Sequence, residues 1–359
     1  MVSEFTHVLS GLDTVECAYY LACPDWSAID FKRLLTLKED IRQSKSREGV
    51  AVDLAELPVL LMPYGNASGY PLIANHKDMV LSFGQWNRPS FFVKFRSEAL
   101  WHTGAAELHQ RFMDWALAAQ LIKLRPETLS RVDFSFDYEY LGAPPRSEDF
   151  VSLAEKDVTH RKDGKNQTVT FGKGDVVLRV YNKVDEIVEK SEKTWFFDLW
   201  QRKENVWRVE WQVRKDVLRR FGIFSFAELE ERMGDLLTYL STEHDSWRVP
   251  NEDSNRSRWP LHPLWADIQD RAGKMNRLGV VREYDEAAQI DERLMRIAIS
   301  VYGYLKKTGA LVSVKESLEG MGFKEGLSHL IRLLHQVHDP LTWKTDITKR
   351  MNDIRHGRW

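Results

Sequence analysis

The chain has 359 residues, with 51 Lys and Arg against 53 Asp and Glu, so its formal net charge is −2. A hydrophobic fraction of 43% supports a packed core and excludes a disordered chain. The two cysteines, Cys17 and Cys23, exclude a disulfide framework or a zinc finger and fit a reducing compartment.

The sequence has no run of the roughly 18 apolar residues that a membrane span needs. Its first ten residues lack the basic patch and apolar stretch of a signal peptide. We therefore expect a soluble, cytoplasmic protein with no membrane partner. The near-zero net charge excludes a histone-like polycation, but a local basic surface can still bind nucleic acid.

Short strand-like and helical runs alternate through the first 124 residues. Segments 14–21 and 79–83 are predicted strands, 90–101 is a further strand leading into a turn, and 28–47 is a charged helix. Between 104 and 124, apolar residues recur at helical spacing. This spacing predicts an amphipathic helix that covers a sheet.

Three later segments, 129–138, 175–183 and 206–214, share an alternating pattern. Successive side chains on a strand point to opposite faces, so each segment has one apolar and one charged face. If the strands are neighbours in an antiparallel sheet, helices cover the apolar face and the charged face stays open. The charged and polar positions are Arg131, Asp133, Ser135 and Asp137, then Arg179, Tyr181 and Lys183, and then Arg208, Glu210, Gln212 and Arg214.

Such a face has the groups for phosphodiester chemistry. Carboxylate oxygens suit Mg²⁺ or Mn²⁺, which polarises a phosphodiester. Asp133 and Asp137 lie roughly 13 Å apart along a strand, at about 3.3 Å per residue, so one of them would need Glu210 from an adjacent strand to hold an ion. Arginine and lysine bind phosphate, and a tyrosine can attack phosphorus to form a covalent intermediate.

These residues therefore indicate an enzyme that nicks and joins DNA strands. The same alternation is also typical of any half-exposed sheet. Tyr138 and Tyr140 lie on or near the same sheet, and composition does not choose between them and Tyr181 as the nucleophile.

The three segments also resemble the Rep_trans superfamily, which includes plasmid rolling-circle replication initiators, filamentous-phage replication initiation factors and relaxases of some integrative conjugative elements. The resemblance covers residues 10–230. Its motifs are R-x-D-x-x-x-D at 131–137, T-x-x-x-G at 168–172, R-V-Y-N-K at 179–183 and W-R-V-E-W-x-V-R at 207–214.

The resemblance implies a role for each motif residue. Tyr181 would be the nucleophile, in one catalytic element with Arg179 and Lys183. The ligands of a Mg²⁺ or Mn²⁺ cofactor would be Asp133, Asp137 and Glu210. Phosphate contacts would come from Arg131, Arg208 and Arg214. Apart from the resemblance, the polar, glycine-containing segment 160–167 predicts a hairpin loop, which is either a solvated turn or a loop that follows phosphates through Lys162 and Lys165.

The resemblance also implies a sequence of events. The protein binds a double-stranded origin, exposes a single-stranded nick site and forms a 5′-phosphotyrosyl intermediate, and the free 3′-OH starts rolling-circle replication on a plasmid or phage. A homodimer and a host helicase are the implied protein partners. The alternatives are a relaxase that nicks a transfer origin, a non-catalytic DNA-binding regulator on the same fold, and a hydrolytic metal nuclease.

The C-terminal third differs in pattern. Segment 248–263 is polar, contains proline and lacks periodicity, which predicts a linker between a catalytic domain at 1–247 and a helical region at 264–359. Helices are predicted over 291–307 and 327–337, and a helix–turn–helix can be drawn through 291–320 with Gly309 in the turn. We thus expect an α+β fold: a central antiparallel sheet with an open catalytic face, helices on the other face, and a C-terminal helical region.

Overall fold

The computed structural model describes residues 4–23, 28–45, 47–162, 165–276 and 286–355. Its strands are β1 (Phe5–Tyr19), β2 (Leu21–Ala22), β3 (Val50–Leu54), β4 (Leu57–Leu61), β5 (Leu72–Asn75), β6 (Met79–Phe83), β7 (Phe91–Phe95), β8 (Ile122–Lys123), β9 (Thr128–Tyr140), β10 (Phe150–Ser152), β11 (Asp157–Lys162), β12 (Lys165–Phe171), β13 (Val176–Asn182), β14 (Val206–Arg214) and β15 (Asp245–Trp247). Its α-helices are α1 (Phe31–Gln43), α2 (Ser97–Thr103), α3 (Ala105–Ala118), α4 (Lys183–Glu186), α5 (Trp195–Trp200), α6 (Lys215–Arg220), α7 (Phe226–Tyr239), α8 (Pro263–Gly273), α9 (Glu286–Glu316), α10 (Phe323–Val337) and α11 (Trp343–Arg355). Short 3₁₀ or π turns are η1 (Ser147–Asp149), η2 (Ile187–Ser191), η3 (Leu240–His244), η4 (Arg256–Arg258) and η5 (Pro340–Thr342).

Eleven of the described strands form one antiparallel sheet, in the order β11-β12-β13-β14-β9-β1-β7-β6-β5-β4-β3. The three alternating segments are β9, β13 and β14, and β14 lies between the other two. The pairing of β9 with β14 runs without a register shift from Val206 opposite Glu139 to Arg214 opposite Arg131. The predicted α+β fold with a large antiparallel sheet is therefore confirmed, and the alternating residues of neighbouring strands share one face.

Helices cover the apolar face of this sheet, as the alternation predicts. Phe136 of β9 and Trp211 of β14 are fully buried there, and Trp265 of α8 meets the Trp211 ring edge-on at 5.4 Å. Aromatic side chains bury 150–250 Å² each and dominate the energetics of such a core. Helix α7 packs beside α8 and begins with a capping box in which Ser225 and Glu228 satisfy each other's backbone N–H groups.

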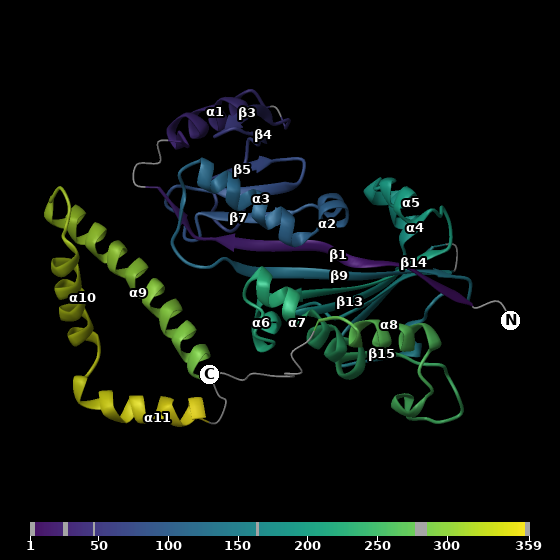
Figure 1. Ribbon diagram of the computed structural model, residues 1–359. Helices are drawn as coiled ribbons and strands as arrows, with labels where there is room; N and C mark the ends of the chain where they lie inside the picture. Colours follow the sequence, from purple (N-terminus) through teal and green to yellow (C-terminus); the bar gives the residue numbers. More distant parts are fainter. Residues whose placement is uncertain (1–3, 24–27, 46, 163–164, 277–285, 356–359) are drawn as a thin grey trace. The chain divides into compact units, whose positions relative to one another are not determined.

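The charged face is covered at one end, which differs from the open face that the sequence predicts. The segment 183–200 folds back over it, so that Phe196 and Trp200 of α5 form a second apolar cluster with Val206 of β14. Trp101 of α2 meets the Phe196 ring edge-on at 5.6 Å. Figure 1 shows α5 and α8 on opposite sides of the strands. Phe196 and Trp200 are large apolar side chains, and they are buried by packing on the charged face at the end that contains Val206.

The chain divides into two units, Met1–Glu283 and Tyr284–Trp359. This division lies after the linker predicted at 248–263. Arg248 pairs with Leu261 in a β-bridge, and the His262 ring stacks on Trp247 at 3.9 Å. Trp265 of α8 is fully buried in the first unit. Residues 248–273 thus belong to the first unit, because the apolar side of α8 completes its core.

The second unit contains α9, α10 and α11 (Figure 1). Both helices predicted there, at 291–307 and 327–337, lie within described helices, α9 and α10. Gly309 lies inside α9, so the helix–turn–helix drawn with Gly309 in its turn is wrong. None of the described helices is long and apolar enough to cross a membrane.

Candidate active site

The charged face of β9, β13 and β14 holds the candidate site in two rows across the strands. Directly opposed residues in an antiparallel sheet have Cβ atoms about 4.5–5.5 Å apart, so each row is a set of close neighbours. The first row contains Tyr181, Arg208 and Asp137, and the second contains Arg179, Glu210 and Ser135. Gln212 lies opposite Asp133 one step further along the face.

Arg208 and Asp137 of the first row belong to a buried ion cluster, which we call the Arg208 cluster: Arg208, Asp137, Asp13 and Trp200. Arg208 is fully buried, and its Nε and Nη2 donate to the two carboxylate oxygens of Asp137 at 2.6 and 2.8 Å. Its Nη1 donates to Asp13 Oδ1 at 2.7 Å. The indole of Trp200 donates to Asp137 Oδ2 at 2.9 Å. Every partner of this arginine is therefore supplied by the protein.

Asp13 enters the Arg208 cluster because β1 has a register shift between Leu12 and Thr14. Its Oδ1 also accepts bonds from the Ser97 hydroxyl at 2.9 Å and from Trp101 Nε1 at 3.1 Å. Burial alone would raise the pKa of Asp13, but the Arg208 guanidinium and the more distant Lys193 hold it below its ordinary value. The sequence motifs do not predict a role for Asp13. The signal that could have indicated one is a carboxylate within the strand-like segment 5–19.

Two predicted roles change at this cluster. Arg208 was expected to contact phosphate, but its side chain has no exposed surface and is paired to two carboxylates. Asp137 was expected to bind a metal ion. It is also fully buried, and both of its oxygens already accept hydrogen bonds from Arg208, with Oδ2 accepting a second from Trp200. The geometry therefore assigns this pair to holding the sheet and the covering segment together.

The second row, with Tyr181 of the first row and two further residues of β9, forms what we call the Glu210 cluster: Glu210, Tyr181, Arg179, Asp133, Arg131 and Ser135. The Tyr181 hydroxyl donates to Glu210 Oε2 at 2.9 Å. Arg179 donates through Nη1 to Glu210 Oε1 and through Nη2 to Gln212 Oε1, both at 3.1 Å. Burial, and then the negative charge of Glu210, raise the pKa of Tyr181 well above its ordinary value. The tyrosine therefore needs a proton acceptor in order to react, and Glu210 is in contact with it.

Asp133 lies at the far end of the Glu210 cluster. Arg131 grips it through two hydrogen bonds, from Nε to Oδ1 at 2.7 Å and from Nη2 to Oδ2. Burial raises the pKa of Asp133 to about 6, with the Glu210 carboxylate adding to the rise and Arg131 opposing it. Asp133 lies opposite Gln212, and the next pair on the same face is Ser135 with Glu210. The register therefore places the carboxylates of Asp133 and Glu210 as diagonal neighbours.

The residues present fit a hard divalent cation in part. Mg²⁺ is commonly held by one or two carboxylates, with substrate phosphates completing its ligands. Asp133 and Glu210 meet that requirement, although both are paired to arginines. Across the described part of the chain, no group of three His, Cys, Asp or Glu side chains comes together. The buried Ser135 hydroxyl, opposite Glu210, lacks a partner among the described residues.

Lys183 places its ammonium over the ring of Tyr181. It is 2% exposed, its Nζ donates to Glu186 at 2.5 Å, and it lies 5.5 Å from the Tyr181 ring centroid. Burial, and then the charge of Arg208, lower the pKa of Lys183. Its contacts support the tyrosine ring and anchor the start of α4.

The competing tyrosines lie on the other face of the sheet. Tyr138 is fully buried and donates its hydroxyl to Asp267 of α8 at 2.7 Å. Tyr140 meets the Trp247 ring edge-on at 5.6 Å in the same core. Among these three tyrosines, Tyr181 is the one whose hydroxyl reaches the charged face.

The remaining predicted DNA contacts lie at the margins. Arg214 is exposed at the end of β14. Lys162 and Lys165 pair at the tip of the β11–β12 hairpin, and their side chains lie outside the described residues. Arg131 and Arg179 keep 20% and 32% of their side-chain surface exposed. The arginines with exposed surface therefore lie within the Glu210 cluster, as Arg131 and Arg179 do, or at the end of β14, as Arg214 does.

The T-x-x-x-G motif sets the position of Tyr181. Thr168 of β12 lies directly opposite Tyr181 of β13. Gly172, just after β12, has a φ of +86°, and a Cβ at this position would lie 2.4 Å from the carbonyl oxygen of Val176. A glycine is therefore required for the chain to turn tightly and pair β12 with β13 in this register.

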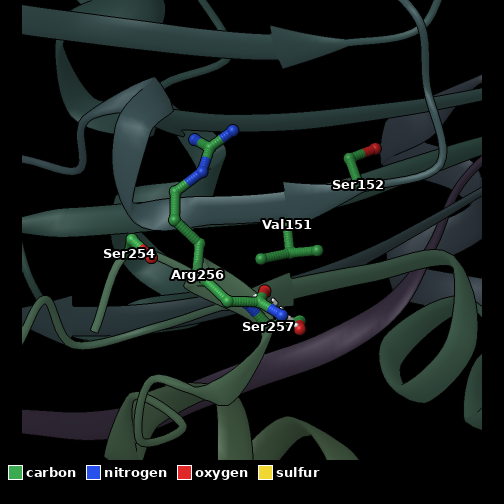
Figure 2. Close-up of a pocket in the computed structure, with 6 residues that line it drawn as sticks. Val151, Ser152, Ser254, Arg256 and Ser257 are labelled. Carbon is green, nitrogen blue, oxygen red and sulfur yellow. Dashed lines mark hydrogen bonds between the residues drawn. The ribbon is translucent and has the colours of Figure 1, made fainter.

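A described cavity of about 490 Å³ lies away from the charged face, between β10 and η4. Figure 2 shows its lining, with Val151 and Ser152 of the strand on one side and Ser254, Arg256 and Ser257 on the other. None of these residues belongs to the Arg208 or Glu210 cluster. The candidate site is thus an array of side chains on a sheet rather than this pocket.

No family model and no curated protein matches the chain. A solved structure of a rolling circle replication initiator protein from Geobacillus stearothermophilus is similar over 74% of this chain and 97% of that chain, with 14% sequence identity and a TM-score of 0.45. Membership of the superfamily that the motifs resemble stays a prediction.

Proposed function

We propose that this protein nicks one DNA strand at an origin by attack of Tyr181 on a phosphodiester, and so starts rolling-circle replication. The observation that carries the proposal is the 2.9 Å hydrogen bond from the Tyr181 hydroxyl to Glu210, on a face where Arg131 and Arg179 are partly exposed. The order of the sequence motifs supports the same chemistry. The proposal rests on these side chains and not on the distant structural similarity.

The reaction is a transesterification. Tyr181 Oη forms a bond to phosphorus and passes its proton to Glu210 Oε2, while the bond from phosphorus to the 3′ oxygen breaks. The 5′ end then stays on the tyrosine, and the 3′ oxygen takes up a proton and leaves as a free hydroxyl. Because one phosphoester replaces another, the reverse reaction rejoins the strand without a further energy source.

We infer that the arginines exchange partners when DNA binds. In the free protein, Arg131 neutralises Asp133 and Arg179 neutralises Glu210. A phosphate offers each guanidinium an equivalent bidentate partner, which frees carboxylate oxygens. Asp133 and Glu210 would then hold Mg²⁺ or Mn²⁺, which supplies stabilisation of the charge that develops on the phosphate.

Access to Tyr181 requires a movement of the covering segment. Tyr181 is 8% exposed, and the Lys183 ammonium contacts both its ring and that of Phe196 in α5. Glu192 and Gln201, which flank α5, have φ angles of 55° and 54°. These left-handed positions mark where the backbone reverses on either side of α5. We infer that a single-stranded nick site enters as this segment lifts.

Partners and cellular location follow from the same proposal. The substrate would be a double-stranded origin with a single-stranded nick site, and the protein would act in the cytoplasm, as a homodimer and with a host helicase. The same chemistry at a transfer origin would make it a relaxase.

A covalent-adduct assay tests the proposal. Wild type and Tyr181→Phe are incubated with Mn²⁺ and supercoiled DNA that carries the protein's own gene and flanks. Denaturing gels and peptide mass spectrometry then detect DNA-linked protein. Tyr138→Phe is the matched control, because Tyr138 lies in the same sheet but faces α8. We expect an adduct on Tyr181 that disappears in Tyr181→Phe and with EDTA, and that persists in Tyr138→Phe.

Other outcomes point to other functions. Nicking without an adduct, unchanged in Tyr181→Phe, indicates a hydrolytic nuclease. Tight DNA binding without nicking, independent of metal, indicates the non-catalytic regulator, which the burial of Tyr181 also favours.

A further inference from the structure

Ser135 is the polar group of the charged face that the reaction above leaves without a role. Its side chain is fully buried, and its Oγ has no hydrogen-bond partner among the described residues. A buried hydroxyl without a partner is unfavourable, because it has lost its bonds to water and gained none. Such an atom in the centre of a site suggests that a further group binds there.

The surroundings of Ser135 explain why no protein group satisfies it. On the β1 side its neighbour is Gly11, which has no side chain. A Cβ at Gly11 would lie 3.1 Å from the ring of Trp101, so this position leaves room for the indole and for no polar group. On the β14 side its neighbour is Glu210, whose two oxygens accept bonds from Tyr181 and Arg179.

The neighbours of Ser135 are the oxygens that a hard cation needs. Asp133 is two residues away on the same face of β9, roughly 7 Å along the strand. Glu210 is directly opposite on β14. Asp137, two residues away in the other direction, has both oxygens occupied by Arg208 and so contributes nothing. Asp133 and Glu210 are also paired, to Arg131 and Arg179. These two arginines keep 20% and 32% of their side-chain surface exposed, whereas Arg208 has none. A phosphate can therefore draw the arginines away from Asp133 and Glu210 but not from Asp137.

We propose that Ser135 Oγ is the third oxygen ligand, with Asp133 and Glu210, of a divalent cation at the active site. A serine oxygen is a hard, neutral donor of the kind that Mg²⁺ and Mn²⁺ accept. The position of Ser135 identifies Glu210 and Asp133, and not Asp137, as the carboxylate ligands. The sequence alone did not distinguish among these three. This proposal rests on the metal requirement of the proposed function, but it does not depend on Tyr181.

The test measures Mn²⁺ binding by the loss of the free-ion signal in electron paramagnetic resonance. A short single-stranded oligonucleotide is present so that its phosphates can take up Arg131 and Arg179, and the oligonucleotide without protein is the blank. The variants are Ser135→Ala and Asp133→Asn, with Ser97→Ala as a matched control, because Ser97 is a buried serine that serves the Arg208 cluster. We expect Ser135→Ala to weaken Mn²⁺ binding at least about tenfold, the lower end of what loss of a supporting group costs a metal site. Asp133→Asn should weaken it further, and Ser97→Ala should leave it unchanged.

A second variant separates ligation from packing. Ser135→Cys keeps the size of the side chain but offers sulfur, which prefers soft metals. We expect this variant to bind Cd²⁺ more tightly and Mn²⁺ more weakly than wild type, with competition between the two ions as the readout. If Ser135 only packs against its neighbours, Ser135→Cys should not change the relative affinities for Mn²⁺ and Cd²⁺.

Two results would overturn the proposal: Mn²⁺ binding in Ser135→Ala equal to wild type, or no Mn²⁺ binding by wild type at millimolar concentration. Neither result decides whether Tyr181 forms an adduct, because that assay detects a covalent bond to a different residue. Failure of the proposed function and failure of this metal ligand are therefore distinguishable.

Discussion

The Arg208 and Glu210 clusters lie side by side on one face of one sheet and contain the same kinds of side chain, yet their surroundings differ. Arg208 and Asp137 have no exposed surface, and two carboxylates and an indole complete their hydrogen bonds. In the Glu210 cluster, the arginines are partly exposed, Tyr181 donates to a carboxylate, and the Ser135 hydroxyl has no partner in the part of the chain that the structure describes. Complete pairing makes the first cluster a structural anchor, whereas incomplete pairing leaves the second able to react.

The covering segment produces this difference. Phe196 lies against Arg208, with 4.5 Å from the guanidinium carbon to the ring centroid, and Trp200 bonds to Asp137. Removing water from one end of the face strengthens its ion pairs and makes any unpaired group there costly. Substitutions in the Arg208 cluster should therefore lower stability, and substitutions in the Glu210 cluster should lower activity.

The largest effect on stability is expected for Arg208→Met. Removing one partner of a buried ion cluster leaves two carboxylates buried without compensation, which costs about 3–5 kcal/mol. Urea unfolding of the first unit measures the change, and Arg214→Met is the control, because Arg214 is exposed at the end of the same strand. A loss below about 1 kcal/mol, comparable to the control, would show that the cluster is not an anchor.

Glu210→Gln should affect activity and leave folding nearly intact. The variant keeps the size of the side chain but removes the proton acceptor of Tyr181, and loss of a general base typically lowers rates by about 10²–10⁴-fold. Adduct formation with Mn²⁺ under single-turnover conditions gives the rate. The control is Glu139→Gln, which changes a partly exposed glutamate of β9 that is paired with Arg202, and it should retain the wild-type rate. Equal rates in the two variants would remove Glu210 from the mechanism.

Asp13→Asn should reveal the pH dependence of the anchor. The folded pKa of Asp13 lies below its unfolded value, so its stabilisation is present above about pH 4 and is lost as the pH falls through the folded pKa. At pH 7 the variant should lose about 1.5–3 kcal/mol, the range for a hydrogen bond to a charged group. The difference in unfolding free energy between wild type and variant should shrink below about pH 4. A difference that stays constant down to pH 2 would contradict the ion pair.

The smallest changes in unfolding free energy are expected for substitutions of two buried serines, Ser97 and Ser135. The Ser97 hydroxyl donates to Asp13, and its removal in Ser97→Ala should cost about 1 kcal/mol. Ser135→Ala removes a hydroxyl for which the described residues offer no partner, so without metal its unfolding free energy should be unchanged or slightly higher. Thermal unfolding in EDTA compares the two variants. A larger loss in Ser135→Ala than in Ser97→Ala would mean that Ser135 has a structural partner.

Much of the fold could be predicted because it depends on local patterns. The alternation in β9, β13 and β14 follows from the two-residue repeat of a strand, and it correctly assigned Tyr181, Glu210 and Asp133 to one face. The helical repeat in 104–124 predicted α3, although that helix ends at Ala118, before the prediction did. The linker at 248–263 was misplaced because polar composition does not reveal that a neighbouring helix completes the core.

The sequence by itself determined which side chains share the charged face, because strand periodicity is a property of the backbone. Only the tertiary structure decided what each of them does. Asp133 and Asp137 occupy equivalent positions in one motif, but Arg208 and Trp200 saturate Asp137. Asp133 is a diagonal neighbour of Glu210 and is paired to the partly exposed Arg131. The contacts that distinguish them come from β1, α2 and the segment 183–200, far away in the chain. The burial and pairing of a side chain depend on such distant contacts. These two properties distinguish the Arg208 cluster, a structural anchor, from the Glu210 cluster, the proposed reactive site.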